Sequence, residues 1–323
     1  MPDLLPQDVR CVAVIGTGSV GASWAALFLA QGIDVVAHDP SPNAETFARD
    51  FVDKAWPALR ELGVARVDPA PQARMRFADS IAEAVVQADV VQENAPEKPA
   101  LKAQLLREID AAASPEKIIL SSTGGIPPST LQDACAHPQR LVVMHPFNPP
   151  HLIPLVEVVG GRQTDPAVVD WALAFARYLG KRPIRVNVEA NGHMTNRLQF
   201  ALVREAVACL AEGVASASDI DAAVRYGLGP RWTLMGSLLT MHLAGGPGGM
   251  QGILAHAGAA LEEWWQPRPH LRLTPEIVEK LVRAASEVSQ DASIAEWIGW
   301  RDRNLVDVIK LQHKSEKQEP KAR

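Results

Sequence analysis

Short apolar runs alternate with amphipathic stretches over the first half of the chain. Cys11 to Ile15 is an apolar run with the length and composition of a buried β-strand. Ala22 to Gln31 then has helical character and ends at Gly32, and a second apolar run extends from Ile33 to Ala37. This pattern predicts a strand, a helix and a second strand parallel to the first.

The alternation continues as far as a strand that ends at His145. The segments expected before it are helices at 44–62, 81–87 and 100–112 and strands at 75–77, 89–92 and 118–121. Repeated units of this kind form a mostly parallel, doubly wound sheet with helices on both faces. Ligands bind beyond the carboxyl ends of the strands in such sheets. His145 and Glu93 are both expected at that edge.

The pattern becomes entirely helical after about Asn191. Residues 193–215 have the apolar spacing of one long amphipathic helix. Ser218 is expected to cap the next helix, which would close at Gly227 and Gly229.

The fold class predicted from these patterns is α/β. A Rossmann-type doubly wound sheet is expected at 1–188, followed by an all-α domain at 189–310. The charged tail, 311–323, is expected to fray.

Composition excludes several classes of partner. The 323 residues are 47% hydrophobic and 21% charged, and the net charge of −5 argues against binding to nucleic acid. We find no apolar run of membrane-spanning length and no secretory signal. The cysteines are odd in number and lie in apolar or helical contexts, which indicates reduced thiols in a cytoplasmic protein. No His/Cys spacing predicts a metal site. The three cysteines are Cys11, Cys135 and Cys209.

A glycine-rich turn joins the first strand to the first helix. It reads Gly16-Thr17-Gly18-Ser19-Val20-Gly21, the pattern G-x-G-x-x-G. The first glycine permits the tight turn, the second lets the backbone approach a pyrophosphate, and the third lets the helix pack closely on the strand. The N-terminus of the helix offers unpaired N–H groups to the phosphates. The turn therefore predicts a dinucleotide site, and the alternative is a glycine turn without a ligand.

Asp39 follows the second strand, where an acidic residue accepts hydrogen bonds from the adenosine ribose hydroxyls. Its charge would repel a 2′-phosphate, and Pro40-Ser41 supply no compensating arginine. Strand, glycine turn, helix, strand and acid in this order favour NAD, rather than NADP, as the cofactor.

A second candidate site lies in the stretch MHPFNPPHLIPLVEVVGG, residues 144–161. His145 ends an apolar run, and Glu157 lies inside another. Burial of a carboxylate is costly unless another group pairs with it. Histidine is a natural partner because it exchanges a proton near neutral pH. The two residues predict an acid–base pair, and the alternative is a structural histidine at a strand end.

These motifs together resemble the 3-hydroxyacyl-CoA dehydrogenase superfamily over nearly the whole chain. The shared features are the GTGSVG turn, the segment Glu93-Asn94-Ala95-Pro96-Glu97 with Lys102, the HPFNPP run, the PLVEVV strand and Gly192-x-x-x-Asn196-Arg197. The resemblance implies that His145 is the general base for the substrate hydroxyl while the nicotinamide receives a hydride. Glu157 would orient the imidazolium that forms and stabilise it.

The resemblance also assigns roles to three further residues. Asn196 is expected to hydrogen-bond the substrate, and Glu97 and Lys102 to lie near the nicotinamide ribose. For Glu97 and Lys102, a solvated start of a helix is the alternative.

The sequence departs from the family pattern at Gly124. The family usually has a serine there, which hydrogen-bonds the substrate oxygen beside the histidine. Either Ser122, Thr123 or a water takes over that role, or activity is reduced. The loss of one hydrogen bond to a reacting oxygen costs on the order of 10²-fold or more in rate.

The C-terminal half resembles one group within the superfamily. Its segments at 226–236 and 239–246 look like those of L-carnitine dehydrogenases, and the gulonate 3-dehydrogenase (lambda-crystallin) group is next. Both groups use small substrates with a free carboxylate, which Arg231 would clamp. Carnitine also has a quaternary ammonium, which binds to aromatic faces such as that of Trp232. A salt bridge for Arg231 and simple packing for Trp232 remain open.

The resemblance implies NAD-dependent oxidation of the 3-hydroxyl of a small carboxylic acid, with L-carnitine as the first candidate substrate. Gulonate or a 3-hydroxyacyl-CoA is the alternative substrate. A crystallin-like NAD-binding protein with weak or no catalysis is the alternative from another class. A homodimer formed through the C-terminal helices is also expected.

Overall fold

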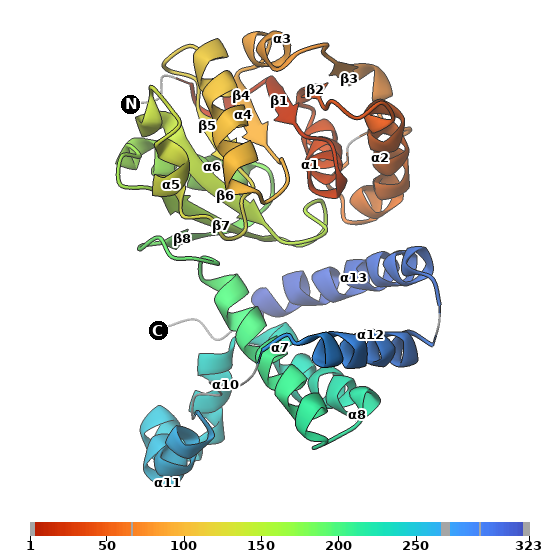
Figure 1. Cartoon of the computed structure of the whole chain (residues 1–323), viewed down its shortest axis with the longest axis vertical. Helices are drawn as coiled ribbons and strands as arrows, with labels where there is room; N and C mark the ends of the chain where they lie inside the picture. The colour runs from red at the N-terminus through yellow and green to blue at the C-terminus, as the bar shows by residue number, and fades with distance from the viewer. Residues whose placement is uncertain (1–3, 66, 266–271, 291, 319–323) are drawn as a thin grey trace. The chain divides into compact units, whose positions relative to one another are not determined.

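The computed structural model describes residues 4–65, 67–265, 272–290 and 292–318. The chain divides into two compact units, Met1–Gln199 and Phe200–Arg323. The first is built around a β-sheet and the second from helices (Figure 1). This confirms the predicted fold class.

The described residues of the first unit form an eight-stranded sheet. Its strands are β1 (Cys11–Ile15), β2 (Asp34–His38), β3 (Met75–Phe77), β4 (Val90–Glu93), β5 (Ile119–Ser121), β6 (Leu141–Pro146), β7 (Leu155–Gly160) and β8 (Arg182–Val186). Their order across the sheet is β3-β2-β1-β4-β5-β6-β7-β8. Neighbouring strands are parallel, except that β6 and β7 are antiparallel. The carboxyl ends of β1, β2, β4, β5 and β6 therefore meet at one edge.

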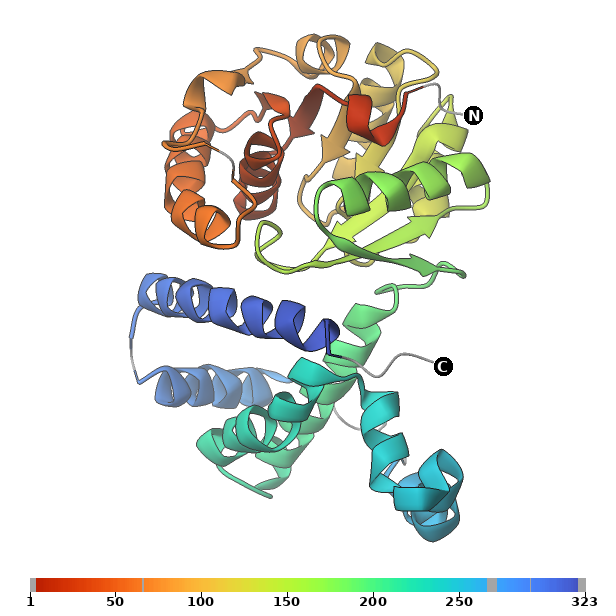
Figure 2. The same cartoon turned by 180° about the vertical axis from the view of Figure 1, so that it is seen from behind.

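Helices cover both faces of this sheet. They are α1 (Ser19–Ala30), α2 (Ala44–Glu61), α3 (Ile81–Val86), α4 (Pro99–Ala112), α5 (Pro128–Gln132) and α6 (Pro166–Tyr178), with short 3-10 turns η1 (Pro6–Asp8), η2 (Gln72–Arg74) and η3 (Pro138–Arg140). One apolar cluster joins α1, α2 and α6 to the sheet, and another joins α3, α4 and α5 to its opposite face. Figure 1 shows α4 and α5 in front of the sheet. Figure 2, which views the molecule from the opposite side, shows α6 in front of the sheet.

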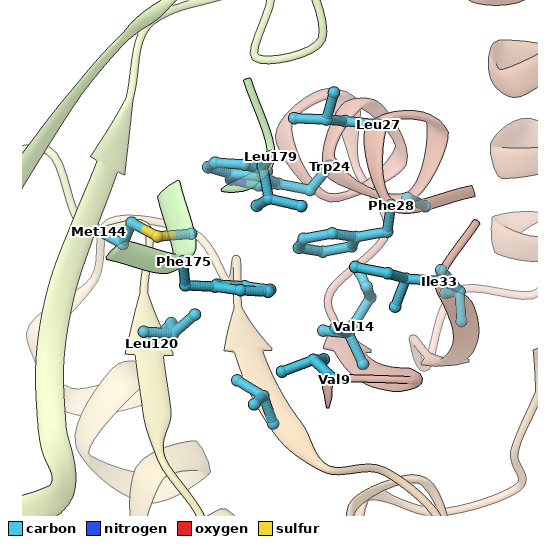
Figure 3. Close-up of a cluster of buried hydrophobic side chains, with 14 of the residues drawn as sticks. Val9, Val14, Trp24, Leu27, Phe28, Ile33, Leu120, Met144, Phe175 and Leu179 are labelled. Carbon is cyan, nitrogen blue, oxygen red and sulfur yellow. The ribbon is translucent and has the colours of Figure 1, made fainter. Parts of the chain in front are cut away.

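Stacked aromatic rings form the centre of the larger cluster. Trp24 and Phe28 of α1 stack with ring centroids 5.6 Å apart, and Phe28 lies 6.3 Å from Phe175 of α6 (Figure 3). All three side chains are buried. Offset stacking of buried rings adds to the stabilisation from apolar burial. This packing fixes α1, and with it the glycine turn, against the sheet.

The second unit is helical. Its elements are the later part of α7 (Thr195–Glu212), α8 (Ala217–Ala222), the π-helical turn η4 (Ala223–Leu228), α9 (Gly229–Leu234), α10 (Ser237–Ala244), the 3-10 turn η5 (Gly246–Gly248), α11 (Gly249–Trp264), α12 (Pro275–Ser289) and α13 (Ile294–Glu316). Few of its described apolar side chains are buried. Among the described residues, no helix is both long and apolar enough to cross a membrane.

Two predictions about α8 are wrong. Its N-cap is Ser216, whose hydroxyl accepts a hydrogen bond from the amide of Asp219, and not Ser218. The helical path also does not close at Gly227 and Gly229, because the π-helical turn connects α8 directly to α9.

The ends of two other helices also differ from the prediction. The long helix α7 begins at Thr195 instead of His193, because Gly192 and His193 have positive φ values of 75° and 49°, outside the right-handed helical region. The last helix, α13, starts with a capping box at Ser293 and extends to Glu316. The first part of the expected frayed tail is therefore helical, and residues 319–323 lie outside the described residues.

Residues after the predicted boundary at Val188 belong to the first unit. The Glu189 carboxylate accepts hydrogen bonds from the amide and hydroxyl of Ser129, and the Gly192 amide donates to the Gly125 carbonyl at 3.0 Å. These bonds hold the chain at the edge of the sheet before α7 begins.

Candidate active site

The glycine turn has the geometry that a dinucleotide needs. Gly16 has a φ of 87°, which favours glycine, and its amide donates to the carbonyl of His38 at 2.9 Å. A Cβ on Gly21 would lie 1.9 Å from the Gly16 carbonyl oxygen, so only glycine fits there. Nothing lies within 4 Å of the corresponding position on Gly18, and no side chain caps α1. The first N–H groups of α1 include those of Ser19 and Val20. With open space at Gly18 and no side-chain cap, they can donate hydrogen bonds to a bound pyrophosphate.

Asp39 lies directly against this turn. One carboxylate oxygen accepts a hydrogen bond from the Thr17 amide at 2.7 Å, and the other accepts from the Ser41 amide at 2.9 Å. Each oxygen keeps a further lone pair for a ribose hydroxyl. The turn and the acid therefore fit a dinucleotide, while the described residues contain no group of His, Cys, Asp or Glu side chains arranged to hold a metal ion.

The antiparallel pairing of β6 and β7 brings His145 and Glu157 together. The two residues are directly opposite each other in the register, so their side chains are on the same face. His145 Nδ1 lies 2.9 Å from Glu157 Oε2, and both side chains are buried. A carboxylate only accepts, so Nδ1–H is the donor and the neutral ring has its lone pair at Nε2. This is the tautomer that a general base needs.

The second oxygen of Glu157 is bound by the start of α7. Oε1 accepts hydrogen bonds from the Met194 amide at 3.1 Å, the Thr195 amide at 2.7 Å and the Thr195 hydroxyl at 3.0 Å. Burial acts to raise the pKa of Glu157, but the hydrogen bonds from His145 and Thr195 hold that pKa below its usual value. Glu157 therefore stays charged and stabilises a positive charge on His145.

His145 Nε2 faces the backbone of the loop after β5. A side chain on Gly124 would begin 3.1 Å from Nε2 and 3.3 Å from Asn196 Nδ2. The Asn196 amide donates to the Gly124 carbonyl at 2.8 Å. The structure thus brings His145, Glu157, Gly124 and Asn196 together, as the sequence pattern predicts.

The hydroxyls of Ser122 and Thr123 are bonded elsewhere. The Ser122 hydroxyl accepts from Trp24 Nε1 at 3.1 Å and donates to Asn94 Oδ1 at 2.8 Å. The Thr123 hydroxyl is buried and donates to Glu97. Replacement of the absent serine by either hydroxyl remains a prediction that this geometry does not favour.

Glu97 and Lys102 lie close together beyond β4. Glu97 Oε1 also accepts from the Gly125 amide at 2.9 Å, and its Oε2 lies 3.7 Å from Lys102 Nζ. The Lys102 ammonium is buried and binds the buried Glu93 carboxylate at 2.7 Å. Glu97 thus ties together the loops after β4 and β5, and Lys102 belongs to a buried ion pair. Their predicted contacts with the nicotinamide ribose remain predictions.

Sequence reasoning missed three residues of this site. Thr195 and His193 occupy variable positions of the Gly192-x-x-x-Asn196 motif, and Phe147 is part of the HPFNPP run. The Phe147 and His193 rings lie 4.6 and 5.5 Å from the His145 ring, measured between centroids. One signal in the sequence pointed to such residues. Glu157 lies inside an apolar run, and a buried carboxylate needs more hydrogen-bond donors than one histidine supplies.

The predicted substrate residues Arg231 and Trp232 are on α9, in the helical unit. Arg231 donates to the Gly227 carbonyl at 3.2 Å, and both side chains are exposed. Trp297 and Trp300, on α13, line an apolar cavity of about 790 Å³ within that unit.

Both halves of the chain match one protein family. Residues 11–189 match the NAD-binding domain of 3-hydroxyacyl-CoA dehydrogenase, and residues 192–291 match its C-terminal domain. The chain belongs to the 3-hydroxyacyl-CoA dehydrogenase family. Membership confirms the predicted NAD cofactor and the predicted class, an NAD-dependent dehydrogenase that oxidises a hydroxyl group.

The chain is similar to proteins of known name over nearly its whole length. An L-carnitine dehydrogenase of Streptomyces griseus is 47% identical over 305 residues, which cover 94% of this chain and 90% of that protein. An L-carnitine dehydrogenase of Bacillus cereus is 42% identical over 308 residues, covering 95% and 94%. Among solved structures, an NAD⁺-dependent 5-formyl-3-hydroxy-2-methylpyridine 4-carboxylic acid 5-dehydrogenase is similar with a TM-score of 0.82 and 30% identity, covering 94% of this chain and 99% of that chain.

Proposed function

We propose that this protein oxidises the 3-hydroxyl of L-carnitine to the ketone, 3-dehydrocarnitine, with NAD. The observation that carries the chemistry is the buried His145–Glu157 pair, whose Nδ1 to Oε2 distance is 2.9 Å. The similarity to L-carnitine dehydrogenases over nearly the whole chain supports the choice of substrate.

Each residue of the pair has a distinct part in this reaction. His145 Nε2 takes the proton of the substrate hydroxyl. Its Nδ1–H group meanwhile keeps its hydrogen bond to the Glu157 carboxylate. The ionised Glu157 offsets the charge of the imidazolium that forms. The glycine turn and Asp39 would hold NAD, which would supply the acceptor for the hydride of the substrate carbon. The low pKa of Glu157 supports this division, because Glu157 does not compete for the proton.

The other proposed substrate contacts follow from charge and shape. Asn196, which donates to the Gly124 carbonyl at 2.8 Å, holds the substrate oxygen beside His145. Arg231 binds the carboxylate as a bidentate donor. Trp232 offers its ring face to the trimethylammonium group, which neither donates nor accepts a hydrogen bond.

L-Gulonate and 3-hydroxyacyl-CoA remain the alternative substrates. The chain is also a candidate for a weakly catalytic NAD-binding protein, because Gly124 carries no hydroxyl beside His145. All of these alternatives keep the same nucleotide site; the first two differ from the first proposal in substrate, and the last differs in rate.

Side-by-side assays decide between these functions. We expect NAD⁺ reduction with L-carnitine to exceed that with L-gulonate and 3-hydroxybutyryl-CoA, and NAD⁺ to bind more tightly than NADP⁺. His145→Ala is the matched variant, expected to lose at least about 10²-fold in kcat while NAD⁺ affinity stays unchanged. Turnover with gulonate alone would reject carnitine, and no turnover with any substrate would favour the weakly catalytic protein. An active His145→Ala variant would remove His145 as the base.

We also propose that the protein is a cytoplasmic homodimer formed through its helical unit. Large apolar side chains there are well exposed in the single chain, for example Leu238 at 77% and Trp264 at 70%. Exposed apolar surface of this kind is typical of protein interfaces. Cys11, Cys135 and Cys209 are free, as expected in a reducing compartment. A monomer mass in light scattering at micromolar concentration would reject the dimer.

A further inference from the structure

His193 is a second buried histidine beside the candidate base. Its side chain is 1% exposed, and its backbone has a φ of 49°, a conformation that few residues other than glycine adopt. The His145 and His193 rings lie 5.5 Å apart between centroids. A left-handed backbone and a buried polar ring at one position are both costly, which indicates a specific role for the residue.

The hydrogen bonds of His193 fix its tautomer. Nε2 lies 3.1 Å from the carbonyl oxygen of Thr123, and a carbonyl only accepts, so Nε2–H is the donor. Nδ1 is buried and has no hydrogen-bond partner among the described residues. A second proton would create a buried N–H⁺ without an acceptor at Nδ1, so the structure favours the neutral ring.

Burial of His193 also favours the neutral ring, although the charges around it act in both directions. Burial is the main cause that lowers the pKa of His193, and His145 lowers it further. The bond to Thr123 and the carboxylates of Glu157 and Glu97 act to raise that pKa, but they do not outweigh burial. His193 is therefore uncharged at neutral pH.

The bond from His193 belongs to a set that immobilises the loop after β5. His193 binds the Thr123 carbonyl, Asn196 binds the Gly124 carbonyl at 2.8 Å, and Gly192 N binds the Gly125 carbonyl at 3.0 Å. These three successive carbonyls all accept hydrogen bonds from residues 192–196, at and just before the start of α7. Because Gly124 has no side chain, this backbone itself forms the surface against His145 Nε2.

We propose that His193 is a positioning residue for the oxidation. It holds the Thr123–Gly124 backbone against His145 and remains a neutral donor, so no like charge opposes the imidazolium on His145. The inference rests on the proposed role of His145 as the base.

The test compares His193→Phe, which keeps the ring shape but has no donor, with His193→Gln, whose amide nitrogen can occupy the place of Nε2. We expect His193→Phe to lower kcat with L-carnitine by about 10- to 100-fold, because a small misplacement of reacting groups has effects of that size. The deuterium isotope effect on kcat, measured with substrate labelled at the carbinol carbon, should rise as hydride transfer becomes slower. NAD⁺ affinity and the melting temperature with NAD⁺ bound serve as folding controls. His193→Gln should recover most of the rate.

Equal losses in the Phe and Gln variants, with an unchanged isotope effect, would reduce His193 to packing and overturn the proposal. Wild-type activity in His193→Phe would overturn it as well. His145→Ala, assayed in parallel, separates the two proposals: if it stays active the proposed base fails, whereas if only the His193 variants stay active the positioning role fails. If His193→Phe does not fold, the rate of His193→Asn decides. Its shorter side chain tolerates a positive φ but leaves its amide nitrogen near the place of Nδ1, so it should be slow like His193→Phe.

Discussion

Gly124 determines what the substrate oxygen meets beside His145. A Cβ there would lie 3.1 Å from His145 Nε2, closer than ordinary van der Waals contact. Compared with a serine at this position, Gly124 therefore leaves more space beside His145 but offers no side-chain hydrogen bond. The family pattern alone predicted the missing hydroxyl, but only the structure shows that Ser122 and Thr123 are bonded elsewhere.

We expect a hydroxyl at position 124 to raise turnover when serine is compared with alanine, because both side chains add the same Cβ. Gly124→Ala and Gly124→Ser place the same Cβ beside His145, and only serine adds a hydroxyl. The ratio of their kcat/KM values should therefore favour serine by about 10²-fold, the usual effect of one hydrogen bond to a developing charge. Steady-state kinetics with L-carnitine measure it. Equal values for the two variants would mean that the family serine has no counterpart in this site.

The role of a single residue was predictable where the residue type does not suit its sequence surroundings. Glu157 is a charge inside an apolar run, and that alone predicted a buried pair with His145. Thr195 and His193 were not predictable, because their roles depend on a left-handed backbone and on contacts with distant loops. Neither property leaves a periodic signal in the sequence.

At the scale of elements, α1 and its turn offer a matched pair of substitutions. Gly21→Ala places a Cβ 1.9 Å from the Gly16 carbonyl, so the turn must shift and both stability and NAD⁺ affinity should fall. Gly18→Ala meets no atom within 4 Å, so folding should be unchanged while the methyl group obstructs the approach of the pyrophosphate. Thermal melting and NAD⁺ titration distinguish the two. Normal NAD⁺ affinity in both variants would place the nucleotide elsewhere.

Elements with strong periodicity were predicted to within a few residues, including α2 and α4. α6 and β8 were not predicted, although β8 pairs with β7 and so completes the sheet around Glu157. The antiparallel direction of β7 relative to β6, which sets His145 opposite Glu157, was not predicted either. Strand direction depends on which partner a strand finds, and local composition does not encode that choice.

At the scale of the whole molecule, buried titrating groups make stability depend on pH. Burial lowers the pKa of Lys181 to about 7, although its Nζ donates to the carbonyl oxygens of Pro150 and Ile153. An unfolded lysine has a pKa of about 10.4, so above pH 7 the unfolded state binds more protons than the folded state. Stability must then rise with pH. Burial raises the pKa values of Cys11 and Cys135 to about 11, which reverses the trend above roughly pH 8.5, where unfolded thiols ionise.

The free energy of unfolding should therefore increase between pH 7 and about 8.5. One proton contributes at most about 1.4 kcal/mol per pH unit, which limits the gain to about 2 kcal/mol. The lowered pKa values of Glu157 and His193 act only below their unfolded values of about 4.3 and 6.5, outside this window. Lys181→Gln keeps donors for the two carbonyls but cannot titrate, so its curve should rise less steeply there than that of the wild type. Urea unfolding at fixed protein concentration without NAD⁺ measures both curves, and parallel slopes would show that Lys181 is not the group responsible.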